Sequence, residues 1–201
     1  MPLHRTISRS LSLAAIAAFM IVALDGAALA HVGNHSGGLA GGIAHPFSGL
    51  DHMLAMVAVG LWASQFGWPA SWLLIATFPL VMAIGALLGA SGLVLLWVEP
   101  AITGSVFVFG ALIAFALRPS LLASTVLIAL FALFHGYGHG IALPAQGSAL
   151  AYGAGFIIST LALHIIGFAI GAVADRAPVR FVTRSVGAAI AAVGVLLLAS
   201  V

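Results

Sequence analysis

The sequence contains no lysine and no cysteine, and only 5% of its 201 residues are charged. Ordinary globular chains carry roughly 25% charged residues, so this composition excludes a soluble domain. Without cysteine the chain forms no disulfide and no thiolate metal site, and any metal ligands must be nitrogen and oxygen atoms. Six arginines against four acids leave a formal net charge of +2 without a basic cluster, so we expect no nucleic-acid partner.

The chain is instead rich in apolar residues, since 63% of its residues are hydrophobic. Six apolar segments are each near the length that crosses about 30 Å of hydrocarbon. They lie at about 48–66, 70–90, 99–117, 120–140, 148–173 and 182–200. Short connections rich in glycine and proline separate them and predict antiparallel neighbours in one bundle. We therefore expect an all-α, polytopic membrane protein in a lipid bilayer, and homo-oligomerisation stays open.

The first 30 residues are typical of a cleaved secretory signal peptide. Arg5 and Arg9 form a positive start, residues 11–24 form an apolar stretch, and Ala28-Leu29-Ala30 supplies the small-residue cleavage pattern. The alternative is an uncleaved first transmembrane helix, but the apolar stretch is shorter than the ~20 residues that a span needs.

Cleavage after residue 30 leaves residues 31–201 as one six-helix transmembrane domain that begins at His31. The new amine beside His31, with His35 close by, is a candidate for metal capture. The alternative is a flexible, glycine-rich leader with incidental histidines.

A cleaved signal peptide places the mature N-terminus outside and so predicts the side of every loop. The loops at 67–69, 118–119 and 174–181 are then inside, and those at 91–98 and 141–147 outside. All four arginines of the mature chain fall on the inside set, namely Arg118, Arg176, Arg180 and Arg184. This agrees with the positive-inside rule. We expect the cytoplasmic membrane of a bacterium, with both mature termini on the outer side.

Histidines and acids gather at the outer ends of three predicted spans. They are His45, Asp51 and His52 at the first span, Glu99 at the third, and His135 and His139 at the fourth. His164 lies deeper, within the fifth span. His135 and His139 are four residues apart and share a helix face. Ionisable groups at membrane depth are costly and usually functional.

Imidazole and carboxylate together suit a borderline divalent cation such as Ni, Co, Cu or Zn. A lone histidine in a span is more often a packing residue than a ligand, but this many groups converging at one depth favour a metal site. Mixed ligands on separate helices, with His164 further inward, suit passage of an ion rather than tight structural binding.

The chain resembles the HupE/UreJ family of membrane proteins along essentially its whole length. The residues that carry the resemblance are His45-Pro46-x-x-Gly49-x-Asp51-His52, Gly60-x-Trp62-Ala63, Glu99 with Ser105, His135-Gly136-Tyr137-Gly138-His139-Gly140, and Tyr152-x-x-Gly155-Phe156 with Leu163-His164-x-x-Gly167. The resemblance implies a secondary permease for nickel or cobalt that often serves hydrogenase or urease. One departure is Ala142, because similar proteins tend to carry an acidic residue between His139-Gly140 and the next proline.

Two other functions deserve comparison with a transporter. Gly89-Ala90-Ser91-Gly92 resembles the nucleophile motif of an intramembrane serine protease, with His164 as its base. However, Ser91 is predicted at the outer face and His164 nearer the opposite side, so hydrogen-bond reach is poor. A haem-binding membrane subunit would need axial histidines, but His135 and His139 share one helix and do not clamp a flat macrocycle. We expect no enzyme activity and no tightly bound cofactor, only a transported metal ion.

Overall fold

The computed structural model describes residues 37–144, 147–174 and 180–201, and this part of the chain is helical. In chain order its elements are α2 (Gly38–Ala44), η1 (His45–Phe47), α3 (Leu50–Ala63), η2 (Ser64–Phe66), α4 (Ala70–Ala90), α5 (Val98–Ala114), α6 (Leu121–Ile141), α7 (Ala149–Ala174) and α8 (Arg180–Leu198). The predicted signal peptide, His31 and His35 all lie outside the described residues.

Helices occupy all six apolar segments, and their ends agree with the predicted limits within three residues. By length and apolar composition, α4, α6, α7 and α8 each qualify as a membrane span. The segments α2–η1 and α3–η2 meet at a bend of 81°, and together they make a fifth candidate span if they are treated as one broken helix. With its 17 residues, α5 is apolar but shorter. The all-helical membrane fold is confirmed, and the sixth span stays a prediction.

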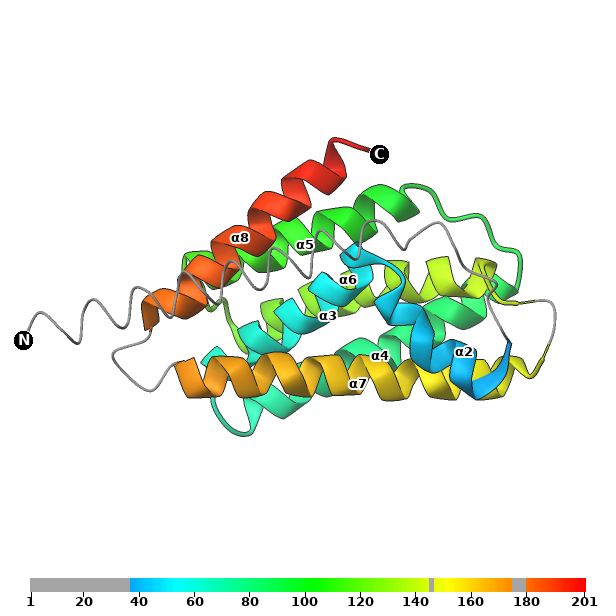
Figure 1. The fold of residues 1–201 in the computed structure, drawn as a ribbon, viewed down its shortest axis with the longest axis horizontal. Helices are drawn as coiled ribbons and strands as arrows, with labels where there is room; N and C mark the ends of the chain where they lie inside the picture. Colours follow the sequence, from blue (N-terminus) through cyan, green and yellow to red (C-terminus); the bar gives the residue numbers. More distant parts are fainter. Residues whose placement is uncertain (1–36, 145–146, 175–179) are drawn as a thin grey trace, which may run out of the picture.

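The tightest helix contacts join helices that are not neighbours in the sequence. α4 contacts α6, α3 contacts α7, and α5 contacts α8. Figure 1 shows α5 and α8 side by side along one side of the molecule, with α7 along the other. Helices that follow one another in the sequence contact each other less closely, and glycines permit the close approach of the distant pairs. A Cβ atom added at Gly60 would overlap the carbonyl oxygen of His164, and one added at Gly136 would overlap that of Met82.

The core of the bundle is α3, which contacts both α5 and α7. From Leu54 to Ala63 every residue except Val57 is fully enclosed. Trp62 lies near the end of α3 and belongs to this core. Its ring is 0% exposed, and its Nε1–H donates to the Leu117 carbonyl at 2.9 Å. A buried indole needs such a partner, and this one ties the end of α3 to the end of α5.

Two arginines lie at the end of the bundle where α3 and α5 finish. Arg118 donates to the Gln65 carbonyl at 2.8 Å, and Arg184 donates to the Ala114 carbonyl at 2.8 Å. Arg176 lies outside the described residues. Since α3 begins with Asp51 and His52, these acidic and imidazole groups lie at the opposite end of the bundle from the two arginines.

Candidate metal site

The start of α3 presents Asp51 and His52 as a bonded pair. Gly49 precedes the helix in an extended conformation. Asp51 Oδ1 accepts hydrogen bonds from the His52 backbone N–H and from its Nδ1, each at 2.8 Å. A carboxylate only accepts, so Nδ1 carries the proton and Nε2 is the free ligand nitrogen. A Cβ atom added at Gly49 would lie 2.7 Å from Asp51 Oδ1 and 3.0 Å from His52 Nδ1, so this glycine leaves room for the pair.

His45 approaches the same region from a segment that the sequence did not predict as helical. The glycine-rich stretch before it forms α2, which lies against α7. A Cβ atom on Gly42 would overlap the Tyr152 carbonyl, and one on Gly155 would overlap that of Leu39. Gly42 makes this close contact, whereas a Cβ atom added at Gly38 would have nothing within 4 Å. η1 follows α2 directly and brings the His45 ring to 4.7 Å from the His139 ring, between centroids.

His135 and His139 lie on α6 and face the start of α3. Their ring centroids are 5.3 Å and 4.6 Å from that of His52, so the predicted shared face is confirmed. His135 is 0% and His139 5% exposed. His135 Nδ1 contacts the Phe131 carbonyl at 2.9 Å. The Nε2 atoms of both side chains are buried without a hydrogen-bond partner among the described residues, which is costly for a polar atom unless something else binds it.

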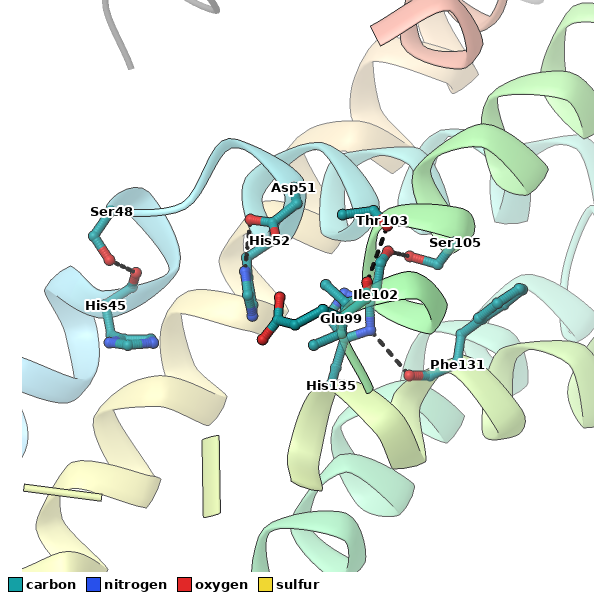
Figure 2. A network of polar contacts seen from close by, with 10 residues as sticks. All are labelled: His45, Ser48, Asp51, His52, Glu99, Ile102, Thr103, Ser105, Phe131 and His135. Carbon is teal, nitrogen blue, oxygen red and sulfur yellow. Dashed lines mark hydrogen bonds and ion pairs between the residues drawn. The ribbon is translucent and has the colours of Figure 1, made fainter. Parts of the chain in front are cut away.

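Glu99 comes to the cluster from the first turn of α5. This helix end packs closely against α6. A Cβ atom added at Gly138 of α6 would lie 3.2 Å from Ile102 and 3.6 Å from Val98, both on α5. The Thr103 hydroxyl donates to the Glu99 carbonyl at 2.9 Å. Figure 2 shows the exposed Glu99 carboxylate pointing toward His52. Four separate chain segments therefore supply the predicted outer residues.

We call His45, His52, His135 and His139 the imidazole cluster. Neighbouring rings in it meet edge to face or tilted, at centroid distances of 4.6 to 6.2 Å. Among the residues that the structure describes, no three His, Asp or Glu side chains are already arranged to hold one ion. The cluster thus brings the predicted ligands together in space, with their rings edge to face or tilted and not aimed at one point.

His164 lies apart from the cluster, inside α7. Its Nδ1 contacts the Thr160 carbonyl at 2.6 Å, and its buried Nε2 has no partner among the described residues. Phe78 of α4 separates it from His135. The Phe78 ring is 5.3 Å from the His135 ring and 5.1 Å from the His164 ring, and it is 0% exposed. Sequence reasoning missed Phe78, since one phenylalanine in an apolar span carries no signal of its own.

Comparison with known proteins now identifies the family. The family described as HupE / UreJ protein matches residues 17–197. The chain is 43% identical over 177 residues to Protein HupE of Rhizobium leguminosarum bv. viciae, a match that covers 88% of this chain and 93% of that protein. The chain belongs to the HupE/UreJ family. HupE/UreJ proteins are metal-transport membrane proteins and not enzymes, so this chain is a multi-pass membrane protein of a metal-transport family. No solved structure matches it.

The HupE/UreJ assignment also removes the protease alternative, and the geometry agrees. Ser91 follows the last turn of α4, where its hydroxyl donates to the Leu88 carbonyl at 2.7 Å. His164 contacts Phe78, which lies about 20 Å from Ser91 along α4 at 1.5 Å per residue. A base that far from a nucleophile cannot take its proton. The haem alternative gains no support either, because His135 and His139 lie on one helix and both of their rings contact the His52 ring.

Proposed function

We propose that this protein is a secondary transporter that carries a divalent transition-metal ion, Ni²⁺ or Co²⁺, and that the ion enters through the imidazole cluster. The observation that carries the proposal is the spacing of the rings. Two imidazoles bound to one ion at about 2.1 Å have centroids about 4.6 to 5.3 Å apart for bond angles between octahedral and tetrahedral. Three pairs in the cluster are 4.6, 4.7 and 5.3 Å apart. Each of these three pairs is spaced as two imidazoles that bind one ion are spaced, whereas the 6.2 Å between His45 and His52 exceeds that spacing.

Exposure decreases from the carboxylates toward the buried histidines. Glu99 is exposed, and the side chains of Asp51 and His52 are 19% and 16% exposed. His135 and His139 are buried, with unpartnered Nε2 atoms. A hydrated cation therefore meets carboxylates first and exchanges its water for imidazoles afterwards. Ligands on separate helices, which are free to rearrange, suit binding that is weak enough for release.

His164 is the next station on the inward path. Its unpartnered Nε2 offers a second imidazole, and Phe78 separates it from His135. A side-chain movement of Phe78 would let an ion pass from one histidine to the other. We propose this aromatic ring as the barrier between the outer and inner stations.

The membrane topology that fits this path has six spans. We propose a cleaved signal peptide, α3 to α8 as the spans, and both mature termini on the outer face of a bacterial cytoplasmic membrane. The imidazole cluster then faces outward. Arg118 and Arg184 lie at the opposite end, as the positive-inside rule requires for the cytoplasmic side.

Uptake of radioactive nickel and cobalt tests the proposal in cells that lack other importers. We expect Asp51→Asn, His52→Ala and His139→Ala to lose uptake at low metal concentration while their amounts in the membrane stay normal. Ser91→Ala is the matched control, because it removes an exposed hydroxyl outside the cluster and should transport like the wild type. Wild-type uptake by all three cluster variants would refute the proposed site.

A further inference from the structure

Tyr137 lies on α6 between His135 and His139 and connects this helix to the loop before α5. Its hydroxyl donates to the Leu93 carbonyl and accepts from the Leu95 backbone N–H at 3.0 Å. The residue itself is 6% exposed. One hydroxyl therefore makes two hydrogen bonds to the connection between α4 and α5.

Little else among the described residues holds this loop. Leu93 is 60% and Val94 85% exposed, Leu96 is exposed as well, and only Leu95 is half-buried, so the apolar side chains of the loop pack little against the bundle. The loop ends at Trp97, whose φ of 65° and ψ of 26° are left-handed. Such a conformation is unfavourable for a residue with a Cβ atom, so surrounding contacts must maintain it. The bonds from Tyr137 are contacts of that kind.

The end of the loop determines where Glu99 lies. Trp97 immediately precedes α5, and Glu99 follows in the first helical turn. We propose that Tyr137 is a positioning residue, whose hydroxyl fixes the loop so that the Glu99 carboxylate lies over the imidazole cluster. This inference rests on the proposed function, in which Glu99 is one of the first groups to meet the metal ion.

Tyr137→Phe removes the hydroxyl and keeps the ring. Loss of the two hydrogen bonds should raise the KM for nickel uptake about fivefold and leave the maximal rate unchanged. In a Glu99→Gln background the same substitution should have no further effect on KM, because there is no carboxylate left to position. If instead Tyr137 only stabilised the fold, the two substitutions would lower uptake independently and the maximal rate would fall with the amount of folded protein.

Because the sequence contains no cysteine, a single introduced thiol in the loop can be labelled selectively. A spin label on Val94→Cys, in a chain that otherwise has no thiol, reports the mobility of one loop position. We expect the label to become more mobile when Tyr137→Phe is added. Ser91→Ala is the matched control, because its hydroxyl bonds to the Leu88 carbonyl at the start of the same loop. It should change neither the label's mobility nor KM.

Two results separate this inference from the proposed function. If Glu99→Gln raises the KM and His139→Ala loses uptake but Tyr137→Phe keeps the wild-type KM and loop mobility, only the role of Tyr137 is overturned. If Glu99→Gln and His139→Ala both transport like the wild type, the metal path itself is wrong.

Discussion

Replacing Asp51 with asparagine removes a negative charge that is bonded to a histidine of the cluster. Asp51 Oδ1 accepts from both the backbone N–H and Nδ1 of His52, at 2.8 Å each. The asparagine oxygen can still accept the Nδ1 proton, so the His52 ring stays in place and Nε2 stays free. What is lost is the charge that makes Nε2 a stronger ligand and attracts the cation.

The size of the expected loss in metal affinity depends on how exposed the Asp51–His52 pair is. A carboxylate that supports a metal-binding histidine contributes about 10- to 100-fold in metal affinity, or about 1.4 to 2.7 kcal/mol. The Asp51 side chain is 19% exposed, so water partly screens its charge. We therefore expect the lower end of the range, a rise of about tenfold in KM for nickel, for the supporting role alone. A larger rise would mean that Asp51 also binds the ion itself.

The assay is the concentration dependence of radioactive nickel uptake, normalised to the amount of protein in the membrane. Asp51→Glu is the matched comparison, because it keeps the charge and moves it by one methylene group. Its KM should lie between those of the wild type and Asp51→Asn. An Asp51→Asn protein with wild-type KM and maximal rate would refute the reasoning, since the carboxylate would then act on neither the histidine nor the ion.

Three further predictions concern helix contact, path and ligand number. Gly60→Ala should lower the unfolding temperature of the purified protein and reduce uptake, because the new Cβ would overlap the His164 carbonyl and overpacking costs about 1 to 3 kcal/mol. Gly153→Ala is the control and should do neither, since nothing lies within 4 Å of its new Cβ. His164→Gln should lower the maximal rate of nickel uptake without changing KM, since His164 lies beyond Phe78 from the cluster; a raised KM with a normal rate would contradict this order. Ala142→Glu should lower the KM for nickel by adding a carboxylate just after α6, and an unchanged KM would show that this position does not face the ion.

The elements of this fold were predictable from sequence, and their partners were not. Apolar length with glycine and proline breaks is a local signal, and it located α3 to α8 closely. Which helices touch depends on matching small residues far apart in the chain, such as Gly136 of α6 against Met82 of α4. That α4 and α6 lie together, and not α4 and α5, depends on those distant matches.

Some parts of the candidate site were likewise predictable from the sequence, and others were not. The outer gathering of His52, His135 and His139 was predicted because topology alone brings the ends of these spans to one face. The positions of Phe78 and Tyr137 were not predictable, because an aromatic residue in an apolar span looks the same whether it separates two histidines, bonds to a loop or faces lipid. Only the packed side chains distinguish these roles.

Nickel uptake into liposomes that contain only the purified protein tests the central claim most directly. A nickel-sensitive dye inside the vesicles reports the ion that has crossed, without help from other cellular proteins. The account predicts dye quenching with the wild-type protein and none above empty vesicles with a His52→Ala, His139→Ala double variant of equal folding and amount. Equal quenching by the wild type and the double variant would contradict the claim that the metal ion enters through the imidazole cluster.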